Sequence, residues 1–259
     1  MMNPVSLNAR GIFPVESKPA EILDYDIIFF GGSGMACAEP KEGKSFHGVV
    51  HKVSEDQMKI LDSIEGTYGR VPSKAKLYDG SILDCSVYSD PTGKIDRSND
   101  KPPTERYITI MTDGAKLHGV KQEYIDWLLN HEKQPRKKPE EFNSYPLPEN
   151  APTWTMEDVL KGNGLDGAPI YTLLNGKVLE YVLPDDYKNR EERHKWAREN
   201  LAGKDREIKM NKMLYDPKYG IKDSVAEMTP EHRAALEDMI NTWDRDVPKL
   251  ARAVAKIGK

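Results

Sequence analysis

Residues 45–53, Ser-Phe-His-Gly-Val-Val-His-Lys-Val, run directly into residues 54–66, Ser-Glu-Asp-Gln-Met-Lys-Ile-Leu-Asp-Ser-Ile-Glu-Gly, and this stretch decides the fold of the first half of the chain. The first part, centred on a Gly-Val-Val run, predicts a β-strand. In the second part Ser54 is an N-cap residue, Gln57 completes a capping box, and Gly66 ends the helix. A strand followed by a capped helix is typical of a mixed α+β domain.

Further short strands surround this unit. Residues 25–30 read as a largely buried strand that ends at a glycine-rich turn. Residues 74–78 and 81–88 flank Asp79-Gly80, which predicts a two-residue hairpin of type I′. The apolar spacing in residues 121–131 predicts a second helix.

The pattern breaks and then restarts. Residues 133–152 are rich in proline and charge, which is typical of a linker, so we expect one domain over 1–132 and another over 153–259. In the second half, Thr155 with Asp158 opens a short helix. Residues 170–174 and 177–183 form a hairpin about Asn175-Gly176, and a long helix begins at Thr229-Pro230 with Leu236, Met239, Ile240 and Trp243 on one face.

The totals exclude several classes of protein. A length of 259 residues is long for one core, and 38% hydrophobic residues is enough for ordinary cores. No run approaches the roughly 18 apolar residues that span a bilayer, and the first residues lack a signal peptide. A formal charge of −4 argues against a nucleic-acid binder. Two cysteines, Cys37 and Cys85, suit a reducing compartment, so we expect a cytoplasmic protein.

Glu65 is the carboxylate with the most informative position. It lies four residues after Leu61 and seven after Met58, on the apolar stripe that also includes Ile64. Burial on that stripe and the dipole at the helix C-terminus both raise the pKa of a carboxyl, which suits a general acid/base near neutral pH. The alternative is a glutamate at the edge of the stripe that reaches solvent.

Several stretches of the first half resemble the γ-glutamylcyclotransferase family in order and spacing, over about residues 20 to 132. They are Gly48-Val49-Val50, Leu61-Asp62-Ser63-Ile64-Glu65-Gly66 with Tyr68, Asp84-Cys85-Ser86-Val87-Tyr88, and Pro102-Pro103-Thr104-Glu105-Arg106-Tyr107 with Gly114-Ala115-Lys116, Gly119 and Tyr124.

The resemblance implies a closed or nearly closed β-barrel with flanking helices. It also implies cyclisation of a γ-glutamyl amide to 5-oxoproline with release of an amine, and no cofactor. Glu65 matches the catalytic acid/base, Tyr88 and Tyr107 match pocket residues, and Gly32 and Gly34 align with a glycine pair that we take as substrate-binding. The alternative for the two tyrosines is that they are half-buried strand residues.

One motif of that family has no counterpart in these 259 residues. It is the N-terminal Tyr-Gly-Ser-Asn turn, whose backbone N–H groups bind the substrate's carboxylates. Met2-Asn3-Pro4 aligns with residues that would follow the turn. Either coding sequence lies upstream, or part of the substrate site is lost and the protein is a catalytically silent binding or scaffold protein.

Residues 153–259 resemble the cytochrome b5-like haem/steroid-binding family. The matching pieces are 154–160, 166–171, 175–178, 201–205 and 228–243. The family's haem-proximal tyrosines are missing here, and Tyr187 and His194 are the nearest substitutes as haem ligands. Five charges in residues 190–198 favour a charged surface helix. This half therefore reads as an interaction or structural module, through which a protein partner is possible, with haem or sterol binding as a weaker alternative.

Overall fold

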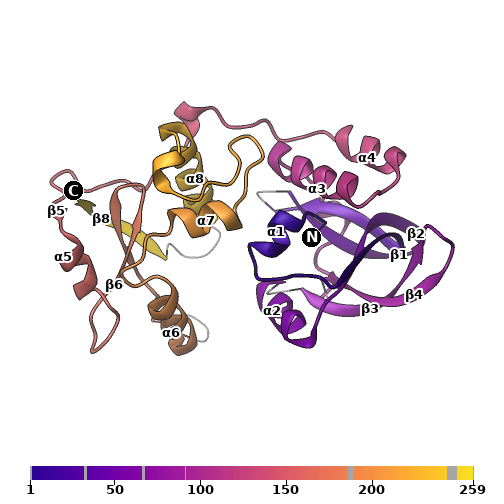
Figure 1. Ribbon diagram of the computed structural model, residues 1–259, viewed down its shortest axis with the longest axis horizontal. Coiled ribbons are helices and arrows are strands. Elements are labelled where there is room, and N and C mark those ends of the chain that lie inside the picture. Colours follow the sequence, from indigo (N-terminus) through magenta and orange to yellow (C-terminus); the bar gives the residue numbers. More distant parts are fainter. Residues whose placement is uncertain are drawn as a thin grey trace. The chain divides into compact units, whose positions relative to one another are not determined.

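The chain forms two compact units. The computed structural model describes residues 2–31, 34–65, 68–90, 92–185, 190–243 and 250–258 (Figure 1). The first unit contains residues 1–136 and 216–218, and the second contains residues 137–215 and 219–259. Each unit has its own sheet, helices and apolar clusters, so the predicted α+β class is confirmed.

Four strands of the first unit close a barrel in the order β1-β2-β4-β3. They are β1 (Glu16–Phe30), β2 (Met35–Lys52), β3 (Gly69–Leu77) and β4 (Ile82–Ser89). β1 and β2 pair along nearly their whole length, with a register shift at Asp24, whose φ is 61°. β2 meets β4 at one bridge, Ala38 to Ser89, where the Ser89 hydroxyl also donates to the Ala38 carbonyl at 2.7 Å.

Helices pack beside the barrel. They are α1 (Pro4–Asn8), α2 (Glu55–Glu65), α3 (Glu105–Leu117) and α4 (Gln122–Leu129), with a short 3₁₀ helix, η1 (Arg97–Asn99), before α3. α2 begins as predicted, since the Gln57 N–H donates to the Ser54 hydroxyl at 3.3 Å. The Gln57 side chain faces the backbone of Phe13, so the capping box is only half formed. Gly66 lies outside the described residues.

Three details of the first unit differ from expectation. The β3–β4 hairpin has a three-residue loop, because Leu77 pairs with Ser81 and only Gly80 has a positive φ. α3 was not predicted, and it places Tyr107 on a helix rather than a strand. Ile64 is 43% exposed, so the buried stripe of α2 is narrower than its spacing indicates.

The second unit has a four-stranded sheet in the order β5-β8-β7-β6, comprising β5 (Thr153–Trp154), β6 (Ile170–Leu174), β7 (Lys177–Tyr181) and β8 (Ala251–Ile257). Its helices are α5 (Met156–Lys161), α6 (Arg190–Asn200), α7 (Glu207–Met213) and α8 (Pro230–Trp243), with 3₁₀ helices η2 (Pro139–Glu141) and η3 (Val225–Glu227). The predicted type I′ turn is confirmed by positive φ at Asn175 (50°) and Gly176 (73°). Thr155 forms the predicted capping box with Asp158.

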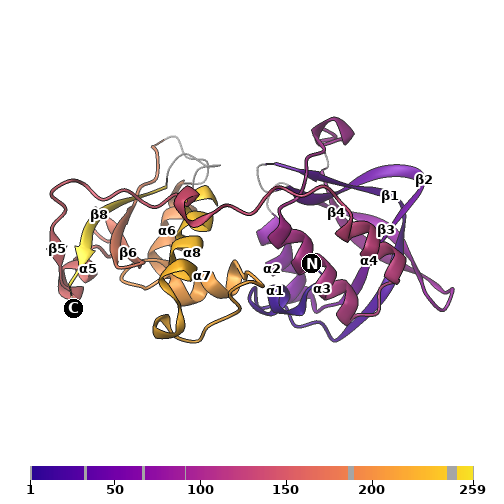
Figure 2. The same ribbon diagram turned by 90° about the horizontal axis from the view of Figure 1, so that it is seen from above.

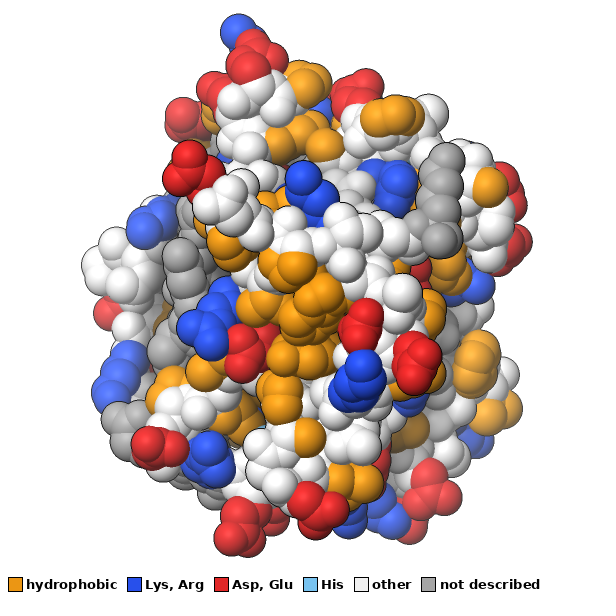
Figure 3. All heavy atoms as spheres, turned by 90° about the vertical axis from the view of Figure 1, so that its left-hand side faces the viewer, with side chains coloured by type: hydrophobic (Ala, Val, Ile, Leu, Met, Phe, Trp, Pro, Cys, Tyr) orange, Lys and Arg blue, Asp and Glu red, His pale blue; other side chains and the backbone are white. Residues whose placement is uncertain are grey.

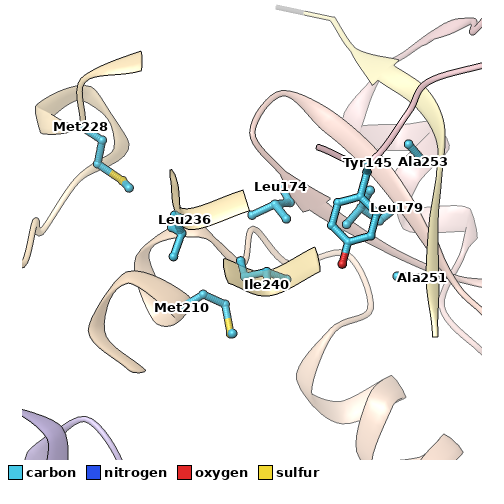
Figure 4. Close-up of a cluster of buried hydrophobic side chains, with 9 residues drawn as sticks. All are labelled: Tyr145, Leu174, Leu179, Met210, Met228, Leu236, Ile240, Ala251 and Ala253. Atoms are coloured by element: carbon cyan, nitrogen blue, oxygen red, sulfur yellow. The ribbon is translucent and has the colours of Figure 1, made fainter. Parts of the chain in front are cut away.

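One side of that sheet packs on α7 and α8. Figure 4 shows the cluster, which contains Tyr145, Leu174, Leu179, Met210, Met228, Leu236, Ile240, Ala251 and Ala253. Tyr145 belongs to the proline-rich segment after residue 136 and is only 4% exposed. Lys137, at the start of that segment, binds Asp238 at 2.9 Å. Residues 137–152 are therefore held on the second unit by a buried ring and an ion pair.

On the opposite side of the sheet, α5 leaves apolar side chains in solvent. Met156 is 43% and Leu160 is 57% exposed. Figure 3 shows hydrophobic side chains gathered in the middle of the face that lies at the left of Figure 1, where α5 and β5 lie. This surface mixes apolar side chains with lysines, arginines and acids.

Within the described ranges, no helix has both the length and the apolar character needed to cross a membrane.

Candidate functional site

Glu65 is the last residue of α2 and is half-buried. Burial raises the pKa of its carboxyl above the ordinary value, and the Arg10 guanidinium partly opposes that shift. Arg10, Tyr68, Tyr88 and Tyr107 all interact electrostatically with Glu65. The carboxylate therefore sits in a partly dry environment with phenols and the Arg10 cation near it, and its raised pKa suits a general acid/base.

The segment after α1 brings Arg10 to this place. Leu7 and Ile12 are buried in one cluster with Leu61, one turn before Glu65. α1 lies close to both α2 and α3 in Figures 1 and 2. Arg10 Nη1 donates to the Ser6 carbonyl at 2.7 Å, which fixes the guanidinium while leaving its other N–H groups available.

Tyr107 enters from the first turn of α3. The Thr104 hydroxyl caps this helix by accepting from the Tyr107 N–H at 3.3 Å. The Tyr107 hydroxyl accepts from the Ala36 N–H at 3.3 Å, which ties α3 to the start of β2. Its ring meets Phe29 edge-on at 6.5 Å. Burial raises the pKa of Tyr107, and the negative charge of Glu65 raises it further, so the phenol stays protonated.

Tyr68, which lies near Glu65, contacts the buried Cys37 thiol. The Tyr68 hydroxyl is buried and, apart from that thiol, has no hydrogen-bond partner in the part of the chain that the structure describes. The Cys37 thiol is nearby and only 3% exposed, and burial raises the pKa of both groups. The thiol is the weak partner that faces this phenol, and a stronger hydrogen-bond acceptor could take its place.

Tyr88 is engaged with α2 rather than free. Its hydroxyl donates to Asp62 Oδ1 at 2.7 Å, and Arg70 lies 3.7 Å from the other oxygen of the same carboxylate. Burial raises the pKa of Tyr88, and the bond to Asp62 adds to the shift. Tyr88 thus orients the helix that ends in Glu65.

Gly34 allows a close backbone approach. Its φ is +57°, and a Cβ there would lie 2.4 Å from Pro103 Cα, just before α3. The glycine is therefore needed to seat the β1–β2 turn on the segment that leads to Tyr107. Gly32 lies outside the described residues.

The structure brings Glu65, Tyr88 and Tyr107 together, and adds three residues that the sequence did not single out: Arg10, Tyr68 and Arg106. Tyr68 and Arg106 were both part of the quoted stretches but received no role. Arg106 follows a Pro-Pro-Thr run that marks a helix start, so an N-cap search could have placed it. No local sequence pattern marks Arg10, because its position depends on the packing of its neighbours Leu7 and Ile12 against Leu61.

In the second unit, His194 lines a hollow of about 530 Å³. Apolar walls come from β6, β7 and the residues that flank them, and α6 supplies charged groups that include Arg190, Lys195 and Arg198. Its volume is within the range of small-molecule sites. Tyr187, the other predicted ligand, lies outside the described residues. Among the described residues, no group of three or more His, Cys, Asp or Glu side chains could hold a metal ion.

Comparisons with known proteins found similarity over part of the chain. No curated protein matches the sequence. An uncharacterized protein from Homo sapiens is 22% identical over 53% of this chain and 86% of its own, with a TM-score of 0.44. A gamma-glutamyl cyclotransferase is 22% identical over 49% of this chain and 78% of its own (TM-score 0.41). The AIG2-like family matches residues 45–128, which run from within β2 to within α4 and include Glu65.

Proposed function

We propose that the first unit cyclises γ-glutamyl amides to 5-oxoproline and releases the amine. The observation that carries the proposal is Glu65, a half-buried carboxyl with a raised pKa at the end of α2, inside the region that matches the AIG2-like family. The proposal is also supported by the sequence resemblance to γ-glutamylcyclotransferases, in which Glu65 matches the catalytic acid/base. The amine that is released is left open.

The reaction needs one proton carrier. The substrate's α-ammonium gives a proton to the Glu65 carboxylate, and the free amine then attacks the γ-carbonyl carbon. A new C–N bond closes the five-membered ring, and the protonated Glu65 gives its proton to the leaving amine nitrogen as the amide C–N bond breaks. Glu65 then carries the second proton from the ring nitrogen to the released amine, which leaves as an ammonium ion. Holding the chain bent provides the large effective molarity of an intramolecular attack.

Mass spectrometry of the products tests the proposal. The full chain is incubated with γ-glutamylbutylamide, and 5-oxoproline is quantified. Glu65→Gln should lower kcat by about 10²–10⁴-fold, since the amide keeps the shape but carries no proton. Asp56→Asn is the matched control, because Asp56 is an exposed carboxylate on the same helix and its loss should leave kcat unchanged.

The alternative is a catalytically silent binding or scaffold protein. Absence of 5-oxoproline from the wild-type reaction, with several γ-glutamyl amides, would favour it. Activity that survives Glu65→Gln would remove this residue from the mechanism.

A weaker proposal concerns the second unit, whose sequence resembles cytochrome b5-like haem/steroid-binding domains. Its support is that the half-buried His194 lines the hollow described above, so a ring nitrogen is available as an axial ligand. The charged side chains of α6 favour a surface helix instead. A Soret band after haem addition that is lost in His194→Ala would support haem binding, and a colourless mixture would dispose of it.

A further inference from the structure

We propose that Arg10 and Arg106 bind the α-carboxylate of the substrate's glutamyl group beside Glu65, so that the site selects γ-glutamyl compounds whose α-carboxylate is free. The inference rests on the proposed function and names the substrate feature that this site recognises. Two side chains, rather than a backbone turn, supply the recognition.

Three segments converge to place these groups. Arg10 follows α1 and lies between Leu7 and Ile12, which pack beside the last turns of α2. The Asn3 side chain donates to the Ile110 carbonyl at 3.2 Å, which fixes the same segment on α3. Arg106 is the second residue of α3. The N-terminus of this 13-residue helix carries a partial positive charge, which adds to the positive potential around the Arg106 guanidinium.

The two arginines differ from the other three of the first unit. Arg70, Arg97 and Arg136 each form an ion pair with an aspartate. Neither Arg10 nor Arg106 has an ion pair in the described part of the chain. Arg106 Nε is buried without a hydrogen-bond partner there. Both arginines are half-buried, and a partly desolvated guanidinium without a counterion is costly, so an anion that occupies this place is stabilised.

The charges near Arg106 are of both signs, and Glu105 and Asp216 already form ion pairs with Arg136. Arg106 interacts electrostatically with Arg10, Arg136 and Asp216. Both oxygens of Asp216 are already bonded to Arg136, at 2.7 and 3.3 Å. The negative charge of Glu65 attracts Arg10, but the two side chains do not form an ion pair. Burial lowers the pKa of both Arg10 and Arg106, as expected where positive charges lack a close partner.

The arrangement fits an α-amino acid head group. A guanidinium fork binds a carboxylate through two parallel N–H···O bonds. Glu65 repels an anion and attracts a cation, so the carboxylate turns to the arginines and the α-ammonium to Glu65. One carbon separates these two groups in the substrate. Binding the carboxylate therefore delivers the ammonium to the base that must deprotonate it.

The kinetic test compares γ-glutamylbutylamide with its α-carboxamide, which differs only in the charge at that position. We expect the wild type to use the carboxylate substrate about 100-fold better in kcat/KM. At a pH above the acidic limb, where Glu65 is ionised in every variant, Arg10→Gln and Arg106→Gln should each raise KM for the carboxylate at least about tenfold and affect the α-carboxamide much less. Arg106→Lys keeps the charge without the fork and should recover part of the loss.

Lys74→Gln is the control, since Lys74 is an exposed cation on β3 whose only ion pair among the described residues is with the exposed Asp84. A folding defect would lower the rates on both substrates alike, whereas loss of carboxylate recognition lowers only one. Unchanged KM in both arginine variants, or equal losses on the two substrates, would overturn the inference while the cyclisation itself still stands.

A binding arm separates this inference from the proposed function. Calorimetry measures the affinity of the wild type for 5-oxoproline and for uncharged 5-oxoprolinamide. Tighter binding of the acid that disappears in Arg106→Gln supports the anion site, even if no amide is turned over. Equal binding of the two compounds contradicts it.

Discussion

At the scale of single residues, the protonation of Glu65 controls the proposed chemistry. The base must be ionised in the free enzyme, and the pKa of the Glu65 carboxyl is raised by burial above its usual 4.5, with Arg10 acting in the opposite direction. The neighbouring phenols of Tyr68, Tyr88 and Tyr107 remain protonated, because their pKa values are raised as well. The acidic limb of kcat/KM therefore reports Glu65.

Removing the Arg10 charge should move that limb to higher pH. Without the cation the carboxylate loses stabilisation, so its pKa rises further and activity is lost earlier on acidification. The measurement is kcat/KM against pH for Arg10→Gln and wild type, with Lys74→Gln as the control whose limb should not move. A shift of the limb to lower pH would contradict the assignment.

The sequence predicted the helix that ends in Glu65 and the nearby tyrosines Tyr88 and Tyr107, but not Arg10 or a role for Tyr68. Glu65 was placed by helix spacing and by its motif, both of which are local. Arg10 and Tyr68 act through contacts between distant segments, and no periodicity in the chain encodes those contacts. The engagement of Tyr88 with Asp62 depends in the same way on a strand meeting a helix.

At the scale of elements, Gly114 shows how closely the helices approach. It lies inside α3, and an added Cβ would meet the backbone of Met2 and Asn3 at 2.5 to 2.8 Å. Gly→Ala within a helix normally stabilises it by up to about 1 kcal/mol. Here the clash with backbone should reverse the sign.

We therefore expect Gly114→Ala to destabilise the first unit by about 1–3 kcal/mol and to displace α1, with Arg10 behind it. Denaturant melts measure the change, and KM for the carboxylate substrate should rise in parallel. Leu117→Ala is the control, since Leu117 is 67% exposed on the same helix and its loss should stay within about 0.5 kcal/mol. If Gly114→Ala stabilised the protein instead, α3 and the backbone of Met2 and Asn3 would have to lie farther apart than the structure places them.

Elements with strong local signals were predicted, and those set by long-range pairing were not. α2, α5 and the Asn175-Gly176 turn carry cap or turn residues and formed as expected. β8 and the first half of β1 have no cap or turn residues that would mark their ends in the sequence, and they were not predicted. The Asp79-Gly80 turn shows the limit of a dipeptide signal, because the strand register decided the loop length.

At the scale of the whole molecule, a buried ionic network holds the second unit together. Glu237 is 1% exposed and accepts from the Tyr145 N–H at 2.8 Å, from Asn175 at 2.5 Å and from Lys177 at 2.5 Å. It joins α8 to the β6–β7 turn and to the proline-rich segment. Removal of one partner of a buried ion pair costs about 3–5 kcal/mol.

Glu237→Ala should therefore expose the amides of the second unit to hydrogen exchange while β1 and β2 keep their protection. Compact units with separate cores open separately. Glu157→Ala, an exposed carboxylate on α5, is the control and should leave exchange unchanged. Simultaneous loss of protection in β1 and β2 would show instead that the two units unfold as one.

The closure of the barrel carries a mechanical consequence. β1 and β2 are joined by a long ladder, whereas β2 and β4 share a single bridge at Ala38 and Ser89. The wall is thus most compliant along that seam, where a transient opening breaks few hydrogen bonds. Ala38 directly follows Cys37, whose thiol contacts the Tyr68 side chain, so a transient opening of this seam should expose these two side chains before the rest of the barrel unfolds.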